Sequence, residues 1–400
     1  MTVVYLDNNA TTAVAPEVLE AMLPYLTTAY GNPSSMHRFG GQVAQAIQTA
    51  REQVADLLGA TPTEIVFTSG GTEGNNTAIR SALASFPNRR HIVTTQVEHA
   101  CVRNLCRHLE KQGYQVTYLS VDRRGQLDLL ELEAALTGDT ALVSVMWANN
   151  ETGVLFPIDQ IGALVKSRGV LFHVDAVQAV GKIPIHLQDS PIDLLTLSGH
   201  KFHAPKGIGA LYVRRGVPFR PLLLGGHQER NRRAGTENVA GSVGLGRAAV
   251  LAKQHLADMA RVQALRDHLE QSILRAIPET VVNGQGSPRL PNTSNLGFKY
   301  IEGEAILLLL DREGICASSG SACTSASLEP SHVLQAMGLP YSVLHGSIRL
   351  SLSRYTTPAD IERVLAVLPG IVAQLRALSP FSDDESDWLT ERTHALLATG

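Results

Sequence analysis

Residues 141–146 read Ala-Leu-Val-Ser-Val-Met, residues 158–167 read Ile-Asp-Gln-Ile-Gly-Ala-Leu-Val-Lys-Ser, and residues 170–175 read Val-Leu-Phe-His-Val-Asp. The first and third stretches are short apolar runs, which are typical of strands buried on both faces of a sheet. The middle stretch has apolar residues spaced as on one face of a helix. A strand, a helix and a second strand in this order predict two parallel strands joined by a crossover helix.

The same alternation continues towards the N-terminus. It predicts strands at 64–69, 91–95 and 115–120, and helices at 41–58, from 73 onwards, at 101–112 and at 128–136. Strands that alternate with helices of this length predict an α/β fold, a mostly parallel sheet with helices on both faces. In such sheets ligands bind outside the carboxyl ends of the strands. The residues that follow each strand are therefore the first candidates for a functional site.

The pattern changes from about residue 248. A long helical stretch is predicted to run to Ile277, followed by a loop rich in glycine and proline at 283–292, a helix at 302–310, and a segment rich in serine and glycine at 317–327. A second domain is therefore predicted to start near residue 255. Residues 382–400 contain four acidic side chains near their start, which predicts an acidic tail.

The composition is that of a soluble globular chain. Of the 400 residues 44% are hydrophobic and 18% are charged, and the formal net charge is −3. This balance gives no electrostatic reason to bind nucleic acid or an anionic membrane. The longest apolar run, at 305–310, is far shorter than the roughly 18 residues of a membrane span, and the N-terminus lacks the pattern of a signal peptide. Four cysteines are too few for a disulfide framework, which predicts a reducing, cytoplasmic location.

A glycine-rich segment, Ser69-Gly-Gly-Thr-Glu-Gly, follows one predicted strand and opens a predicted helix. Glycines let backbone N–H groups approach an anion, the helix N-terminus attracts it, and Thr72 adds a hydroxyl donor. The segment therefore fits a phosphate site. A glycine-rich turn with a helix cap explains the same residues equally well, so this motif alone does not decide between the two.

Three further polar residues follow predicted strands: Asp175, Lys201 and His99. A buried carboxylate at Asp175 needs a cation or a donor, and a protonated ring nitrogen is one such partner. A desolvated amine at Lys201 can attack a carbonyl, and an imidazole at His99 can stack on a ring and move protons. Taken singly, each has a commoner structural explanation: a turn cap, a solvated lysine and a structural histidine.

Cys323 lies in the segment Ser318-Ser-Gly-Ser-Ala-Cys-Thr-Ser-Ala-Ser, whose small polar side chains bury little surface. A thiol in such a loop is a candidate nucleophile. The remaining cysteines, Cys101, Cys106 and Cys316, are predicted to be packing residues, and no pair of cysteines has zinc-binding spacing. Arg354 is predicted to lie at the end of a strand that starts at 348, where its guanidinium would either capture a carboxylate or form a surface ion pair.

Together these residues provide a phosphate cradle, an acid for a pyridine nitrogen, an amine for an aldehyde, an imidazole for a ring face and a guanidinium for a carboxylate. That set describes pyridoxal 5′-phosphate (PLP) chemistry on an amino acid. Through Ser198-Gly-His-Lys201 and Ser318-Ser-Gly-Ser-Ala-Cys323, the chain resembles the cysteine desulfurases of the class V aminotransferase group. Met146-Trp-Ala-Asn-Asn-Glu-Thr-Gly and Gly225-Gly-His-Gln-Glu-Arg are more similar to the nitrogen-fixation (NifS) type than to the housekeeping type.

The resemblance implies a role for each matching residue. Lys201 would carry PLP, Asp175 would pair with its ring nitrogen, and His99 would stack on the ring and transfer protons. The other implied cofactor ligands are Gly71, Thr72, Asn150, Gln178, Ser198, His200 and, towards the phosphate of a partner subunit, Thr236. Asn150 and Arg354 would orient the substrate. Cys323 would take up sulfur as a persulfide, and no intrinsic metal site is implied beyond contact of Cys323 with a transferred iron–sulfur cluster.

The implied fold is the type I PLP-dependent transferase fold, in a homodimer. Its large PLP-binding domain would span 15–254, and its smaller α+β domain would combine 1–14 with 255–381. The implied activity converts L-cysteine to L-alanine and passes the sulfur to an iron–sulfur scaffold protein, here for nitrogenase maturation. The alternatives are a selenocysteine lyase or another class V aminotransferase. The tail at 382–400 has no counterpart in this resemblance and is assigned no role.

Overall fold

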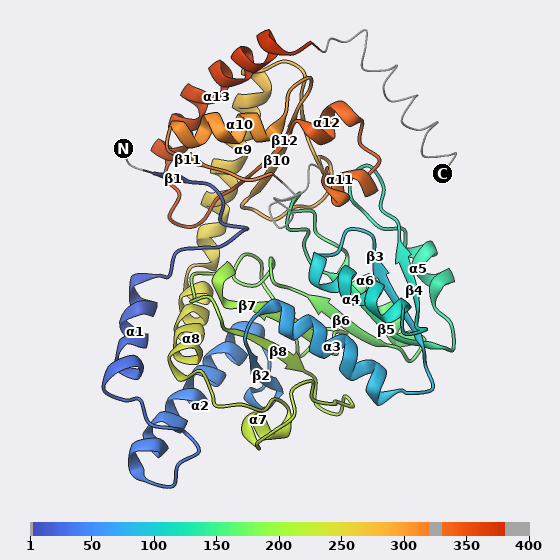
Figure 1. Ribbon diagram of the computed structural model, residues 1–400, viewed down its shortest axis with the longest axis vertical. Helices are drawn as coiled ribbons and strands as arrows, with labels where there is room; N and C mark the ends of the chain where they lie inside the picture. The colour runs from blue at the N-terminus through green and yellow to red at the C-terminus, as the bar shows by residue number, and fades with distance from the viewer. Residues whose placement is uncertain (1–2, 320–329, 381–400) are drawn as a thin grey trace.

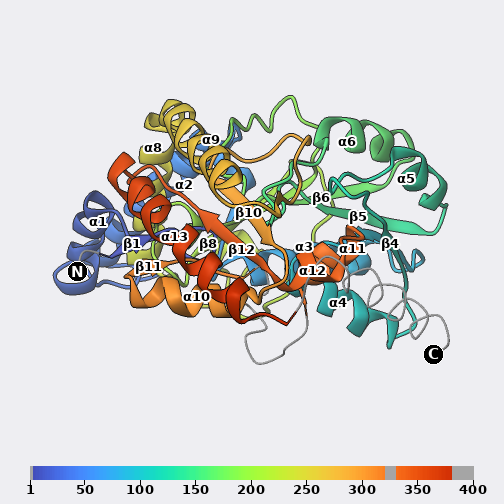
Figure 2. The same cartoon turned by 90° about the horizontal axis from the view of Figure 1, so that it is seen from above.

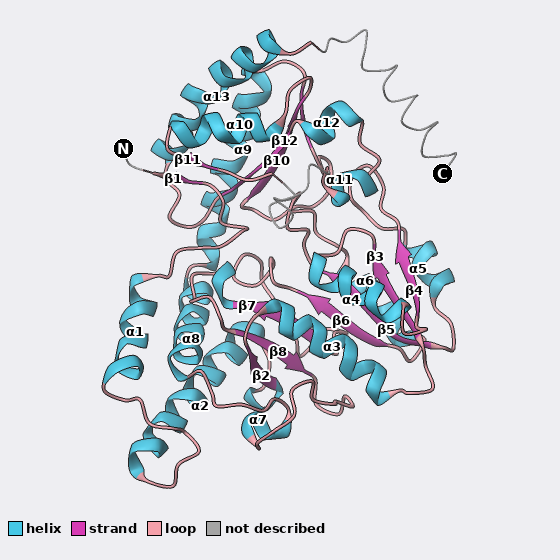
Figure 3. Cartoon of the chain, viewed as in Figure 1, coloured by secondary structure: helices cyan, strands magenta, loops and turns pink. Residues whose placement is uncertain are grey.

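A computed structural model describes residues 3–319 and 330–380 of the chain. Two features predicted from the sequence lie outside the described residues: Cys323 and the acidic tail at 382–400. The described residues form two groups of strands, which Figure 3 shows as separate sets of arrows with helices around them.

The larger sheet has seven strands in the order β2-β8-β7-β6-β5-β3-β4 (Figure 1). They are β2 (Ile65–Thr68), β3 (His91–Thr95), β4 (Gln115–Leu119), β5 (Thr140–Met146), β6 (Leu171–Asp175), β7 (Leu194–Ser198) and β8 (Gly209–Val213). Neighbours from β7 across to β4 are parallel, whereas β8 is antiparallel to both β7 and β2. The prediction of a mostly parallel α/β sheet is confirmed, and β8, which the alternation does not predict, is the antiparallel exception.

Helices cover both faces of this sheet. One face is packed by α1 (Pro16–Thr27), α2 (Arg38–Leu58), α5 (Leu129–Ala135), α6 (Ile158–Ser167) and α8 (Val239–Gln254), and the other by α3 (Gly71–Ser85) and α4 (Ala100–Glu110). In β5, Val143 and Val145 join the first apolar core and Leu142 joins the second. Successive side chains of a strand point to opposite faces, so a strand with buried apolar side chains on both faces requires helices on both sides.

The later part of the chain builds a separate apolar core. Its elements lie above the larger sheet in Figure 1 and are in front of it in the view from above in Figure 2. Its elements are the parallel pair β1 (Val4–Tyr5) and β11 (Ile315–Cys316), the antiparallel strands β9 (Thr280–Val282), β10 (Thr293–Phe298) and β12 (Ser347–Ser351), and the helices α9 (Met259–Ala276), α10 (Gly303–Arg312) and α13 (Pro358–Leu378). Val4 and Leu6 from the N-terminal arm are buried in this core.

The long helix predicted from 248 to 277 is wrong, because α8 and α9 are separate helices joined by a 3₁₀ turn at Leu256–Asp258. Leu251 of α8 packs in the core of the larger sheet, whereas Val262 of α9 packs in the later core. One straight helix would have to present apolar faces to both cores, and the break at His255 lets the two helices do so separately.

Three short helices complete the described structure: α7 (Gln228–Asn231), α11 (His332–Ala336) and α12 (Tyr341–His345). Val333, Leu334 and Met337 in and beside α11 pack in the core of the larger sheet, although they come late in the sequence. The domain boundaries at 14/15 and 254/255 stay predictions. None of the helices within 3–319 and 330–380 is long and apolar enough to cross a membrane.

Five strands of the larger sheet, β2, β3, β5, β6 and β7, run in the same direction as β4 and end at the same edge. Each is followed there by a segment that carries polar side chains singled out from the sequence. This edge faces the N-terminal arm, since Thr12 N–H bonds to the His200 carbonyl after β7. Residues that are far apart in the sequence, from position 9 to position 201, therefore lie close together at this edge of the sheet.

Candidate active site

The cavity at this edge has a volume of about 280 Å³. The structure brings together in its wall nine residues that the sequence pointed to: Gly71, Thr72, His99, Asn150, Asp175, Gln178, Ser198, His200 and Lys201. They come from the segments after β2, β3, β5, β6 and β7. The agreement follows from parallel strands, whose carboxyl ends meet at one edge.

One end of the cavity is built to receive an anion. α3 begins at Gly71, and Gly70 before it has φ of 149° and no side-chain cap on the helix N-terminus. A Cβ at Gly71 would lie 2.8 Å from Val177 Cγ2, so close packing against Val177 leaves no room for a side chain at this position. The first-turn amides of α3, together with Thr72 and Ser198, therefore form a cradle of donors. Burial, and then the charge of Lys201, lowers the pKa of His200 to about 4, so this ring is neutral at pH 7.

Asp175 lies at the end of β6 and is almost fully buried. Its Oδ2 accepts a hydrogen bond of 2.6 Å from Asn75 Nδ2, and its Oδ1 accepts one of 3.0 Å from the Val177 N–H. These neutral donors fix the carboxylate against the cavity wall without neutralising its charge. The described ion pairs include none to Asp175, so a cationic ring nitrogen in the cavity would be a suitable partner.

Lys201 is held by the N-terminal arm. Its Nζ donates to the carbonyl oxygens of Asn9 at 2.6 Å and Ala10 at 2.8 Å. Asn9 is itself buried and connects several other residues: its carbonyl also accepts from Gln178 Nε2, and its Oδ1 accepts from Lys182 Nζ and Asn292 Nδ2. The role of Asn9 was not predicted, because these contacts join residues more than 160 positions apart.

His99 is the N-cap of α4 and projects into the cavity from the loop after β3. Its Nδ1 accepts a hydrogen bond of 3.2 Å from the Cys101 N–H. The neighbouring Glu98 is fully buried, and burial raises its pKa to about 8. With this pKa Glu98 is protonated at neutral pH. Thr95 Oγ1 and the Met146 N–H donate to its Oε1, so Glu98 connects β3 with β5.

The guanidinium in the cavity belongs to Arg349 and not to Arg354. The prediction for Arg354 assumes a strand through 354, but β12 ends at Ser351, because the Ser353 N–H bonds to Thr356 Oγ1 in a turn before α13. Arg354 lines a separate cavity of about 40 Å³ behind Lys201 and donates to the Tyr355 hydroxyl. Arg349 was not predicted. The sequence does hold a signal for it, because this cation stands between the apolar residues Ile348 and Leu350, and the structure shows that it is buried.

Arg349 is 2% exposed and is held rigidly. Its Nη2 pairs with Asp7 at 2.8 Å, and its Nη1 donates to the Asn150 carbonyl at 3.0 Å. Its Nε is buried and has no hydrogen-bond partner among the described residues. A guanidinium held in the wall of the cavity is suited to binding an anionic group of a ligand.

The structure agrees with the prediction for Cys106 and differs from the prediction for Cys101. Cys106 is buried in the apolar contact between α3 and α4, as predicted, and burial raises its pKa to about 12. Cys101 is not a core residue: it lines the cavity, and its Sγ lies 3.0 Å from His99 Nδ1. Cys101 lies at the cavity because it is in the first turn of α4, where its backbone N–H bonds to the side chain of the capping His99.

Comparison with known proteins agrees with this geometry. The sequence pattern of the family described as "Aminotransferase class-V" matches residues 4–364. "Cysteine desulfurase 2" of Trichormus variabilis is 71% identical over 99% of this chain and 100% of that protein. "Cysteine desulfurase NifS" of Azotobacter vinelandii is 58% identical over 94% of each chain. The chain belongs to the cysteine desulfurases of the class V aminotransferase family.

A solved structure supports the same assignment at the level of the fold. The protein described as "NIFS-LIKE PROTEIN" superimposes with a TM-score of 0.88 at 39% identity, over 94% of this chain and 100% of that chain. The predicted family and fold are therefore confirmed. For this cysteine desulfurase the role of Thr236 stays a prediction: it is exposed in the loop before α8, where a partner subunit would have to reach it.

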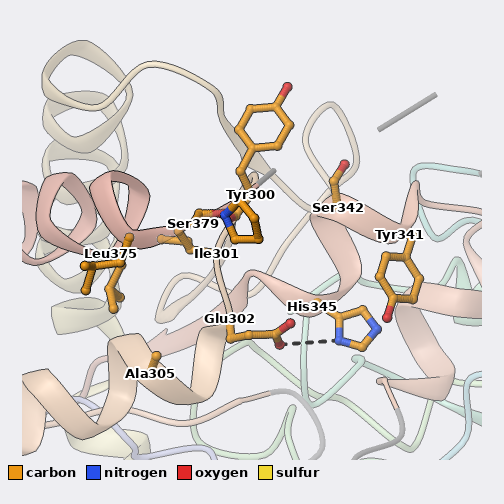
Figure 4. A pocket seen from close by; sticks show the side chains of 11 residues that line it. Tyr300, Ile301, Glu302, Ala305, Tyr341, Ser342, His345, Leu375 and Ser379 are labelled. Carbon is orange, nitrogen blue, oxygen red and sulfur yellow. Dashed lines mark hydrogen bonds and ion pairs between the residues drawn. The ribbon is translucent and has the colours of Figure 1, made fainter. Parts of the chain in front are cut away.

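A second cavity of this cysteine desulfurase, of about 240 Å³, lies between α12 and the end of α13 (Figure 4). Its wall is mostly apolar, and its polar feature is the pair of His345 and Glu302, 3.4 Å apart. It is lined by none of the residues discussed above, and the chemistry of the first cavity does not depend on it.

Proposed function

We propose that this chain is a PLP-dependent cysteine desulfurase that converts L-cysteine to L-alanine and takes the sulfur onto Cys323 as a persulfide. The observation that carries the proposal is the single cavity that holds an anion cradle, a buried aspartate and a lysine together. The sequence resemblance and the cysteine desulfurase relatives support it.

The residues present fit PLP. The cradle at Gly71, Thr72, Ser198 and His200 would hold the phosphate. Asp175 would hold the ring nitrogen, Gln178 the ring hydroxyl, and Lys201 the carbonyl carbon. Bound in this way, the cofactor would supply an electron sink for bonds at the α-carbon of an amino acid.

The chain's own residues would bind and orient the substrate. Arg349, which lines the cavity, would bind the carboxylate beside Asn150. Lys201, once its amine is free, would move the α-proton, and His99 would exchange protons over the ring face. The Cys323 thiolate would then attack the substrate sulfur: a sulfur–sulfur bond forms, the carbon–sulfur bond breaks, and its electron pair stays on carbon, where a proton completes alanine.

Arg349 and Arg354 can be compared directly, as Arg349→Gln and Arg354→Gln. The first variant should raise KM for L-cysteine about 10- to 100-fold, because a hydrogen bond to a charged group contributes roughly 1.5–3 kcal/mol. The second should stay within about twofold, as expected for a residue in a surface turn. Steady-state kinetics measure both, with far-UV circular dichroism as the check on folding. Equal effects, or the reverse order, would place the carboxylate at Arg354.

The proposal also covers the location of the enzyme, its oligomeric state and its sulfur acceptor. We propose a cytoplasmic homodimer in which Thr236 reaches the partner's phosphate site, and an iron–sulfur scaffold protein, in nitrogenase maturation, as the sulfur acceptor. The NifS name of the Azotobacter vinelandii relative supports the last part.

Product analysis tests the proposed activity. Incubated with L-cysteine and a thiol reductant, the purified protein should form alanine and sulfide in equal amounts. Another class V aminotransferase would instead yield a keto acid, and a selenocysteine lyase would leave cysteine unchanged while releasing selenide from selenocysteine. Either of these results would replace the proposal by the corresponding alternative.

A further inference from the structure

Cys101 makes the closest described contact to the ring of His99. Two donors of Cys101 meet His99 Nδ1: the backbone N–H at 3.2 Å and the side-chain Sγ at 3.0 Å. The backbone contact is the N-cap of α4 and is therefore part of the helix itself.

The N-cap hydrogen bond of α4 shows which atom donates in the contact between Cys101 Sγ and His99 Nδ1. A backbone N–H can only donate, so Nδ1 presents its lone pair to the cap and carries no proton in the neutral ring. With Nδ1 an acceptor, the thiol has to be the donor in the contact of 3.0 Å. In the neutral ring the proton is then on Nε2, so Nε2 is the hydrogen-bond donor of the neutral ring, and protonation of the ring adds a proton at Nδ1.

The sulfur atom is in turn oriented by Asn75. Asn75 is buried, and its Nδ2 lies 3.2 Å from Cys101 Sγ and 2.6 Å from Asp175 Oδ2. Its amide hydrogens therefore point to the sulfur and to the carboxylate. This leaves a continuous series of contacts from Asp175 through Asn75 and Cys101 to His99, and all four residues line the cavity.

We infer that Cys101 is a positioning residue of the desulfurase reaction, whose S–H donates to His99 Nδ1 and holds the ring neutral with its proton on Nε2. The inference rests on the proposed function, in which His99 exchanges protons. It assigns a role to the thiol inside the cavity, separate from that of Cys323.

Other titratable and charged groups act on His99 as well. Glu98 from its own loop, Glu151 after β5, and His332 on α11 interact with it electrostatically. Asp175, Lys201 and Arg349 share its cavity, and Arg103 lies close to both Glu151 and His332. Removing the Cys101 thiol changes none of these charges, so a shift in the Cys101 variants reports the thiol contact.

The test compares Cys101→Ala with Cys101→Ser, and uses Cys316→Ala as the matched loss of a thiol outside the cavity. Without the S–H donor the neutral ring loses a stabilising contact, so the pKa of His99 should rise. The acid limb of the kcat/KM profile should move up by about 0.5–1 pH unit in Cys101→Ala, since a hydrogen bond of this kind corresponds to that range. Serine keeps a donor and should return the limb to within about 0.3 unit of wild type. Cys316→Ala should not shift it.

A second readout does not depend on turnover. In cofactor-free protein labelled with ¹⁵N-histidine, the His99 ring is assigned from the signals lost in His99→Gln, and its pKa should rise in Cys101→Ala by a similar amount. An unchanged pKa in Cys101→Ala, or a serine variant that behaves like alanine, overturns the inference. If wild-type protein makes no alanine, the proposed function fails instead, and the NMR titration still reports on the contact.

Discussion

The variant Lys201→Ala should lose at least about 10³-fold in kcat, together with the visible absorbance of the bound cofactor. Among the described residues that line the cavity with Asp175 and His99, Lys201 is the one lysine. The carbonyls of Asn9 and Ala10 aim it there. Its removal takes away both the covalent attachment of the cofactor and the base for the α-proton.

The nearby Lys182 does not replace it. Lys182 is buried and donates to Gln178 Oε1 at 2.8 Å and to Asn9 Oδ1 at 3.2 Å, behind the cavity wall. Lys206 is exposed in the same loop as Lys201 and provides the control, because Lys206→Ala should keep both absorbance and turnover. Retention of turnover in Lys201→Ala would contradict the assignment of the lysine.

Cys323→Ala should reduce sulfide and alanine formation by at least about 10³-fold while the cofactor absorbance still responds to L-cysteine. The described residues on either side of the segment that carries Cys323 contact Arg349 and Glu151, at and next to the proposed substrate site. Ser318 bonds in both directions with the backbone of Arg349, and the Ser331 hydroxyl donates to Glu151. The chain segment that carries Cys323 therefore starts and ends beside the proposed substrate site.

The remaining cysteines serve as comparisons. Cys106 is buried with a pKa raised to about 12, which disfavours the thiolate that sulfur transfer needs. Cys316 is on β11, away from the cavity, so Cys316→Ala should retain turnover. Equal loss of activity in Cys316→Ala and Cys323→Ala would argue against a specific nucleophile.

Local pattern was enough to predict most of the larger sheet. The predicted bounds of α6 and β3 match the structure, because a buried strand or an amphipathic helix can be recognised from the apolar pattern of a few neighbouring residues. β8 was missed, since an antiparallel strand after a loop breaks the alternation. The break at His255 was missed because the apolar spacing continues through it while the core that it faces changes.

The candidate site was predicted where it depends on strand ends, and not where it depends on contacts distant in sequence. Asp175, Lys201 and His99 follow strands and were found in this way. Arg349 was missed in favour of Arg354 because the end of β12 depends on a local turn, and Asn9 because its partners lie far along the chain. Cys101 was assigned to the core because its helix position does not reveal that the cap of α4 borders the cavity.

Mass spectrometry of the protein after incubation with L-cysteine tests the central claim most directly. Wild-type protein, digested without reductant, should carry the added mass of one sulfur atom on the peptide that contains Cys323, with alanine formed in equal amount. Cys323→Ala should carry none. Alanine formation without this adduct, or an adduct on a peptide containing Cys101, Cys106 or Cys316 instead, would contradict the account.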